Sequence, residues 1–308
     1  MNAIVSVRGL SKWYGKVIGL NNFNIDIGKG ITGIVGPNGS GKSTFFKLLT
    51  GNIKANTGHL SVFGEDPWRN PAQLMRIGFC PDYDFLPGEL TGREYLRFVG
   101  GIHAMSGNAL ATRADEVLGI VNMKEAADRR MGGYSKGMRQ RLKIAGCLLH
   151  NPPLLLLDEP LTGTDPVARK DLIDLILRLH QDHGHDIIVS SHVLHEVERL
   201  TRNIAIIYKG RAVATGDLTE IRMLMSGHPH NIIIEGQNLN ALVKLLIDQR
   251  YTVSVEMSKS REGLKVQVDD PEQFFDSLPR LIKESGCELQ TVHSLDDNLE
   301  SVFKYLVG

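Results

Sequence analysis

The sequence predicts a large α/β domain followed by a smaller α+β domain, and three observations support this prediction. Short apolar runs alternate with helical patterns in the first half of the 308-residue chain, and the alternation resumes after residue 150. This order is typical of a mostly parallel sheet covered by helices on both faces. Both patterns lapse at residues 226–230, Ser-Gly-His-Pro-His. We therefore expect domains at 1–225 and 231–308 with a linker between them.

The first domain begins with strand patterns that lead to a glycine-rich turn. Residues 4–7 and 23–27 alternate in polarity as half-buried strands do, and residues 31–35 are apolar enough for a central buried strand. Helix-period apolar residues follow the turn and end at Gly51, a typical C-terminal stop.

The middle of the first domain, from about residue 84 to 150, has mostly helical patterns, and we expect a helical subdomain there. The alternating order then returns. Strands are expected at 154–157, 187–190 and 204–208, separated by helices near 167–183 and 193–200.

The second domain has the order β-α-β-β-α-β, which is the ferredoxin-like arrangement, before one last helix. The strands are expected at 232–235, 252–256, 264–268 and 287–292, and the helices at 239–250, 272–285 and 295–306.

The composition excludes several classes of partner and site. Lysine plus arginine equals aspartate plus glutamate, 35 of each, so no net charge attracts nucleic acid and no nucleic-acid partner is expected. The three cysteines, Cys80, Cys147 and Cys287, are widely spaced and predict buried thiols in a reducing compartment.

The N-terminus lacks the basic region, apolar run and cleavage site of a secretory signal. No window of about 18 apolar residues exists that would span a bilayer. We therefore expect an intracellular, soluble protein that reaches a membrane only through a partner.

A phosphate-binding loop follows the strand predicted at 31–35. Its glycines let backbone N–H groups surround phosphate oxygens, and the following helix N-terminus adds positive potential. Lys42 can reach the β- and γ-phosphates, and the Ser43 hydroxyl can bind Mg²⁺. The alternative, a chance glycine-rich turn, does not explain the strand before it and the helix after it. The residues of this candidate site are Gly36, Pro37, Asn38, Gly39, Ser40, Gly41, Lys42, Ser43 and Thr44.

Two carboxylates end the apolar strand predicted at 154–157. Asp158 can hold Mg²⁺ through its water shell, since magnesium prefers oxygen ligands. Glu159 can point to the opposite side and orient or deprotonate an attacking water. Apolar strands that end in acids are common, so this assignment depends on the phosphate-binding loop.

Three further segments resemble motifs of the ABC ATPases, and all motifs occur in the family order over about residues 3–225. The segments are Tyr-Ser-Lys-Gly-Met-Arg-Gln-Arg at 134–141, Gly-Thr-Asp-Pro at 163–166 and Ser-Ser-His at 190–192, similar to the signature sequence, D-loop and switch histidine. The resemblance implies an ATPase that takes ATP with Mg²⁺.

The resemblance also implies roles for single residues. The helix start at Ser135, Lys136 and Gly137 would face the γ-phosphate of ATP held by a second ATPase subunit, identical or a sister chain. Otherwise Ser135 is only an N-cap.

His192 would contact the γ-phosphate; alone, it would more often be a packed core histidine. Tyr14 occupies the position of the aromatic residue that stacks on adenine. Trp13 precedes it, and strand alternation puts only one of the two toward the nucleotide; we choose Tyr14.

One departure from the family concerns the metal site. Asp82 stands where the family has a glutamine that completes the Mg²⁺ site and signals to the membrane partner. Its carboxylate can reach the ion through water, but its charge would repel a γ-phosphate unless Mg²⁺ screens it. We expect retained hydrolysis with altered coupling; the alternative is that Asp82 only caps a turn.

The other departures, Lys136 in place of glycine and Met138 in place of glutamine, resemble exporters whose permease is a separate chain. Residues 87–94 resemble the same groups. The resemblance thus implies the cytoplasmic motor of an exporter, held at the inner face of the membrane by a transmembrane permease subunit. The alternatives are a soluble ABC ATPase that acts on a ribosome or DNA, and a catalytically weak regulatory subunit.

Overall fold

The computed structural model describes residues 3–84, 86–217, 221, 229–258 and 262–294. It divides the chain into two compact units, Met1–Leu218 and Thr219–Gly308, each treated separately below. Residues 226–228 of the expected linker lie outside the described residues, and His230, its expected last residue, is the first residue of a strand.

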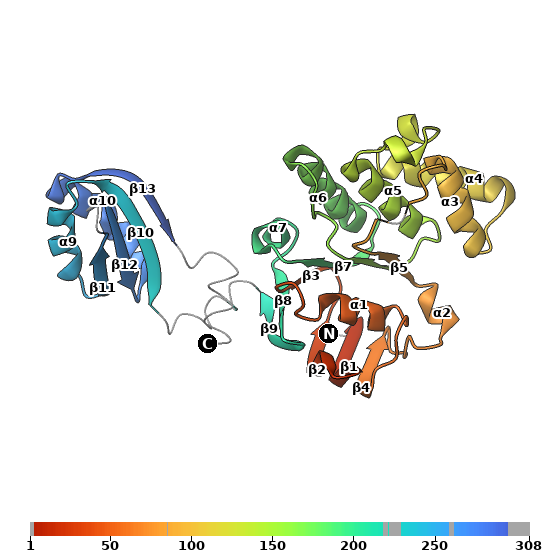
Figure 1. The fold of residues 1–308 in the computed structure, drawn as a ribbon, viewed down its shortest axis with the longest axis horizontal. Coiled ribbons are helices and arrows are strands. Elements are labelled where there is room, and N and C mark those ends of the chain that lie inside the picture. The colour runs from red at the N-terminus through yellow and green to blue at the C-terminus, as the bar shows by residue number, and fades with distance from the viewer. Residues whose placement is uncertain (1–2, 85, 218–220, 222–228, 259–261, 295–308) are drawn as a thin grey trace. The chain divides into compact units, whose positions relative to one another are not determined.

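The first unit is built on a six-stranded sheet with the order β5-β6-β7-β3-β8-β9 (Figure 1). Neighbours from β5 to β8 run parallel, and β9 is antiparallel to β8. Every residue of β3 and β6 is buried, as expected of central strands covered on both faces. The strands are β3 (Ile31–Val35), β5 (Ile77–Cys80), β6 (Leu154–Leu157), β7 (Asp186–Ser191), β8 (Asn203–Tyr208) and β9 (Arg211–Asp217).

Two hydrophobic cores cover the two faces of this sheet. Strand alternation places Leu155 and Leu157 of β6 in the core with the larger helices, and Leu154 and Leu156 in the core with α1. The first core is formed with α3 (Gly92–Ile102), α4 (Gly107–Ile120), α5 (Lys136–Leu148) and α6 (Pro166–Gln181). The second lies under α1 (Lys42–Leu49). Short helices occur at α2 (Pro71–Leu74), α7 (Leu194–Glu198), Lys124–Ala126 and Met131–Gly133.

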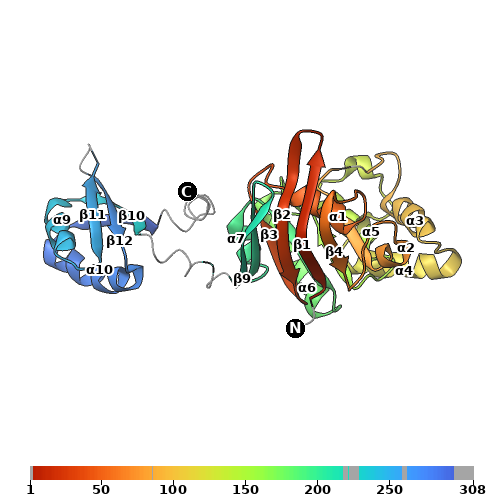
Figure 2. The ribbon, with the colours of Figure 1, turned by 90° about the horizontal axis from the view of Figure 1, so that it is seen from below.

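A separate antiparallel sheet lies beyond α1. Figure 2 shows the first unit from the side on which this sheet lies. It has the order β2-β1-β4, with β1 (Val5–Tyr14), β2 (Val17–Ile27) and β4 (Thr57–Val62). The sequence analysis did not predict this sheet, β4 or β9. Register shifts interrupt the β1–β2 alternation beyond Val7, and half of β4 is exposed in one continuous run, so neither shows a regular period-two pattern.

The second unit has the predicted β-α-β-β-α-β order, with all strands antiparallel in the order β11-β12-β10-β13. Phe274 and Leu281 of α10 and Leu246 of α9 pack on one face of this sheet. The elements are β10 (His230–Gln237), α9 (Asn240–Ile247), β11 (Thr252–Met257), β12 (Gly263–Val268), α10 (Pro271–Ser285) and β13 (Glu288–Ser294). The helix predicted at 295–306 lies outside the described residues.

None of the helices in the described part of the chain combines the length and the apolar character needed to span a bilayer.

Candidate active site

The candidate site lies at the carboxyl ends of β3, β6 and β7, where the loops that follow three parallel strands meet. Because β7 pairs with both β3 and β6, the residues after these strands become neighbours. The loop after β3 is tied to the end of β7 by a hydrogen bond of 3.3 Å from Gly36 N to Ser191 O. Topology alone thus brings together segments separated by more than a hundred residues.

The phosphate-binding loop depends on glycine at two positions. Gly41 has φ 115°, in the left-handed region that other residues rarely adopt. A Cβ on Gly36 would lie 2.3 Å from the carbonyl oxygen of Ile207. The helix α1 begins directly afterwards at Lys42, and no side chain in the described residues caps it. Its first backbone N–H groups therefore point, as a set, toward any anion held by the loop.

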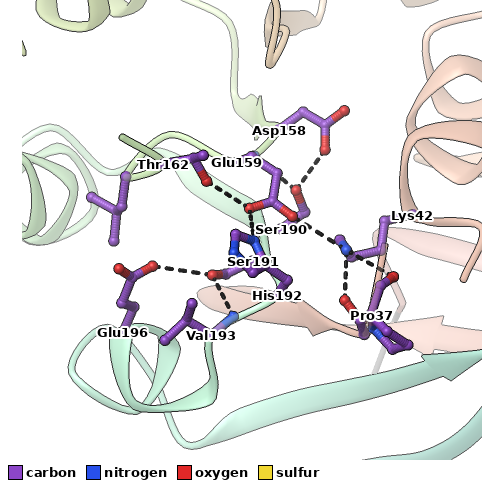
Figure 3. A network of polar contacts seen from close by, with 12 residues as sticks. Pro37, Lys42, Asp158, Glu159, Thr162, Ser190, Ser191, His192, Val193 and Glu196 are labelled. Carbon is purple, nitrogen blue, oxygen red and sulfur yellow. Dashed lines mark hydrogen bonds and ion pairs between the residues drawn. The ribbon is translucent and has the colours of Figure 1, made fainter. Parts of the chain in front are cut away.

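The Lys42 ammonium is held in the loop that precedes it. The side chain is buried, and Nζ donates to Gly36 O at 2.6 Å and to Pro37 O at 3.3 Å. It also forms an ion pair of 3.2 Å with Oε1 of Glu159 (Figure 3). A buried lysine needs such partners because desolvation disfavours its charge. The arrangement presents one positive charge at the floor of the site.

Glu159 is the centre of this polar network. Its Oε2 accepts from Nδ1 of His192 at 2.8 Å and from Oγ1 of Thr162 at 2.9 Å. Burial would raise the pKa of Glu159, but the hydrogen bond from His192 and the charge of Lys42 outweigh it and hold the pKa below its ordinary value. Glu159 is therefore ionised and able to accept a proton or orient a water.

The backbone of Glu159 has φ 50°, in the left-handed region that a residue with a Cβ seldom occupies. Such a conformation costs about 1–3 kcal/mol and is concentrated at functional sites. It turns the Glu159 carboxylate toward Lys42 and His192, while the Asp158 carboxylate points away from them (Figure 3).

Asp158 is buried at the end of β6 and fits a divalent cation. Its Oδ1 accepts from Oγ of Ser190 at 2.5 Å, and Ser43 also donates to it. Burial raises the pKa of Asp158, and the charges of Asp82 and Glu159 raise it further, outweighing these two hydrogen bonds. Asp82 and Glu159 are thus near enough for their charges to act on Asp158, and a Mg²⁺ ion at this position would offset that negative charge.

His192 is oriented by the residues on either side of it. Oγ of Ser191 accepts from Val193 N at 3.0 Å and donates to Oε2 of Glu196 at 3.1 Å. Glu196 is buried and forms an ion pair with Arg169 at 3.3 Å. The loop after β7 is thereby ordered, and the partly exposed His192 ring reaches the site over Glu159 rather than packing in the core.

A cavity of about 430 Å³ opens over these residues. The predicted site residues that line it are Tyr14, Asn38, Gly39, Gly41, Lys42, Ser43, Thr44, Asp82, Lys136, Glu159 and His192. Gly36, Pro37, Ser40 and Asp158 belong to the loops behind this lining and do not line the cavity.

Tyr14 and Trp13 differ in their relation to the cavity. Both are more than one-third exposed at the end of β1, but Tyr14 lines the cavity and Trp13 does not. The phenol ring of Tyr14 and the side chain of Thr44 both lie against Gly19: a Cβ on Gly19 would be 2.9 Å from the ring and 3.0 Å from Thr44. This position at the cavity rim suits a stacking contact with a base.

The first residues of α5 line two different cavities. Ser135 is the N-cap, accepting from Met138 N at 3.3 Å, as the structural alternative expected. Ser135 and Gly137 line a second cavity, of about 620 Å³, together with Asp165. Lys136, the first residue of the helix, instead extends along Gly163 into the first cavity of its own chain. Ser135 and Gly137 thus lie away from the phosphate-binding loop of the same chain.

The sequence analysis gave no separate role to Ser190, which joins the Asp158 carboxylate to the backbone of Glu159. Its Oγ donates to Asp158 and accepts from the backbone N of Glu159 at 2.8 Å. The available signal was a hydroxyl at the end of a buried strand next to His192. Thr162 also donates to Glu159, three residues before it in the same turn, but no sequence pattern pointed to this threonine.

Comparisons with known proteins agree with this geometry. The sequence model of the ABC transporter family matches residues 20–162. The bacitracin transport ATP-binding protein BcrA of Bacillus licheniformis is 32% identical over 100% of this chain and 98% of its own. The daunorubicin resistance ATP-binding protein DrrA3 of Streptomyces coeruleorubidus is 30% identical over 99% of this chain and 96% of its own.

A solved dimeric structure of MJ0796, a bacterial ABC transporter cassette, is similar with a TM-score of 0.63. It is 25% identical and covers 70% of this chain and 98% of its own. Full-length relatives with at least 30% identity and a cassette with the same fold agree on one assignment. The chain belongs to the ABC transporter ATP-binding proteins, the ATPase subunits of these transporters.

Proposed function

We propose that this chain is the ATP-hydrolysing motor subunit of an ABC exporter, working as a dimer on a separate transmembrane permease. One observation carries the proposal: the phosphate-binding loop, Glu159 and His192 share one cavity, while Ser135 and Gly137 of the signature segment lie outside it. A chain built in this way needs the signature segment of a second chain to enclose ATP.

The residues take distinct roles in hydrolysis. Lys42 holds the β- and γ-phosphates, and Tyr14 stacks on adenine. Glu159 orients or deprotonates the attacking water, and His192 holds Glu159 in place and contacts the γ-phosphate. Ser43, Asp158 and, through water, Asp82 would hold Mg²⁺, which supplies charge neutralisation on the phosphates.

The export direction is supported by the named relatives, one a bacitracin transport protein and the other a daunorubicin resistance protein. Residues 1–225 form the ATPase domain, with a helical subdomain at about 84–150, and residues 231–308 form an accessory domain. The permease holds the chain at the cytoplasmic face of the membrane, and the second ATPase subunit is a copy of this chain or a sister chain.

The dimer is tested with the Glu159→Gln variant. Because this variant binds ATP without hydrolysing it, we expect a dimer at saturating ATP and Mg²⁺ and a monomer without nucleotide, measured by light scattering after gel filtration. Lys42→Ala is the matched control, which should stay monomeric with ATP. A monomeric Glu159→Gln chain at saturating ATP and Mg²⁺ contradicts the proposal.

The permease is tested by purifying the tagged chain from detergent-solubilised native membranes. We expect a polytopic membrane protein in stoichiometric amount. Recovery only from the soluble fraction, bound to ribosomes or DNA, would leave the ATPase in place and reject the transporter role.

A further inference from the structure

The helix α5 contacts the segment around Asp82 at successive positions. Nζ of Lys143 donates to Pro81 O at 2.9 Å and to Tyr83 O at 3.2 Å. One turn earlier, Nε2 of Gln140 donates to Sγ of Cys80 at 3.3 Å. The two carbonyls belong to the residues on either side of Asp82, so the ammonium holds the backbone at both sides of that residue.

Lys143 is an unusual residue for this place. It is 7% exposed, and the hydrogen-bond partners found for it among the described residues are backbone carbonyls. A buried lysine without a carboxylate partner carries a large desolvation cost, and an apolar side chain would pack at this position without that cost. Simple packing of α5 against β5 therefore does not account for it.

The held segment lies at the metal side of the nucleotide cavity. Asp82 and Lys143 both line the cavity. Asp82 is near enough to Asp158 for its charge to act on that carboxylate. The same helix begins at Ser135, the residue that faces the second ATPase subunit in the proposed dimer. Lys143 thus connects the helix that a second chain would engage with the position of Asp82 in its own site.

We propose that Lys143 is a positioning residue, which holds Asp82 at the Mg²⁺ side of the ATP site and offsets its negative charge. The inference rests on the proposed function, because it assigns Asp82 to the metal site. It would explain how an aspartate can stand at this position, because a cation fixed on the two neighbouring carbonyls reduces the repulsion that the Asp82 carboxylate exerts on phosphate.

The experiment measures nucleotide binding, not turnover. A fluorescent trinitrophenyl-ATP analogue is titrated into the wild type, Lys143→Met and Lys143→Arg, with MgCl₂ and with EDTA. We expect Mg²⁺ to tighten binding of the analogue in the wild type. In Lys143→Met this increase in affinity should be about tenfold smaller, since hydrogen bonds to charged groups contribute on this scale. Binding in EDTA should change less than twofold, and Lys143→Arg should retain most of the Mg²⁺ gain. Lys47→Met, an exposed lysine on α1, is the matched control.

A second arm separates positioning from a general weakening of the fold. In the Asp82→Gln background, Lys143→Met should have less than a third of its effect on the Mg²⁺ gain, because the carboxylate that Lys143 serves is gone. Equal effects in both backgrounds, or an unchanged Mg²⁺ gain in Lys143→Met, would overturn the inference. If Lys143→Met does not fold, Lys143→Gln, which can donate to one carbonyl, carries the same test. Failure of the wild type to bind the analogue would instead reject the proposed function.

Discussion

Two of the three sheets in the described part of the chain, the six-stranded sheet of the first unit and the four-stranded sheet of the second, differ in strand direction, and this difference separates chemistry from packing. In the first, β3, β6 and β7 run parallel, so the residues that follow them meet at one edge. In the second, neighbours alternate in direction, so each edge receives both strand starts and strand ends.

Polar side chains follow the same division. Those of the second sheet pair with one another across strands: Ser254 donates to Gln267, which donates to Asn231, and Thr291 donates to Glu235. In the first sheet, the segments that follow β3, β6 and β7 bring Lys42, Glu159 and His192 to one cavity. The comparison teaches that topology, more than the kind of residue present, decides where ionised groups accumulate.

The strongest test of this comparison replaces one lysine in each sheet region. Lys42→Ala should lower the steady-state ATPase rate about 10³-fold, because it removes a preorganised positive charge at the phosphates. Lys265→Ala, in β12, should leave the rate within twofold. A comparable loss in both variants would contradict the assignment of the chemistry to the first unit.

The independence of the two cores is tested next. Phe274→Ala, in the core of the second unit, should destabilise that unit by about 3–5 kcal/mol, the range for a fully buried phenylalanine. The urea midpoint for loss of ATPase activity should not move. Phe45→Ala, in the core under α1, should lower that midpoint and leave the unfolding of the second unit unchanged. If either variant shifts both transitions, the units do not unfold separately.

A smaller effect is expected for Ser190, which bonds the Asp158 carboxylate and the backbone N–H of Glu159. Ser190→Ala should lower kcat about 10- to 100-fold with little change in protein stability, since it removes one hydrogen bond to the Asp158 carboxylate and one from the Glu159 backbone. Ser254→Ala removes a similar hydroxyl from the second sheet and should cost about 1 kcal/mol or less in stability and no activity. Steady-state kinetics and urea titrations of both variants decide this.

The smallest effect concerns acid stability of the first unit. Burial and, to a smaller degree, the neighbouring His103, whose ring is stacked on it with the centroids 4.0 Å apart, lower the pKa of His150 from 6.5 to about 4. Between these pH values the unfolded chain binds a proton that the folded chain does not, so stability falls as pH falls from 6.5 toward 4. We expect a loss of about 1 kcal/mol from this residue between pH 7.5 and 5, after allowing for solvent screening.

His150→Gln should flatten that pH dependence in the first unit, measured by urea titration at both pH values. The unfolding transition of the second unit is the internal reference and should have the same pH dependence in both proteins. An unchanged slope for the first unit in His150→Gln would show that other groups cause its acid sensitivity.

Much of the fold and of the candidate site was predictable because its signals are local. The apolar runs at 31–35 and 154–157, the glycine-rich loop and the acids after the second run each stand in one short stretch. The order of elements in the second unit was predictable for the same reason, and the structure confirms it. The antiparallel sheet was missed because bulges in β1 and the polar surface of β4 hide the strand period.

The sequence by itself indicated the family, and it predicted the glycine-rich loop after β3 and the two carboxylates after β6 as the candidate site, because these signals depend on residue type and spacing within a few positions. Only the tertiary structure decided which groups act on one another across the chain. Three sets of contacts join residues that are far apart in the sequence: the ion pair of Lys42 with Glu159, the hydrogen bonds of Ser190 with the Asp158 carboxylate and the Glu159 backbone, and those of Lys143 with the Asp82 segment. Such contacts arise from strand order and helix packing, which no local pattern records.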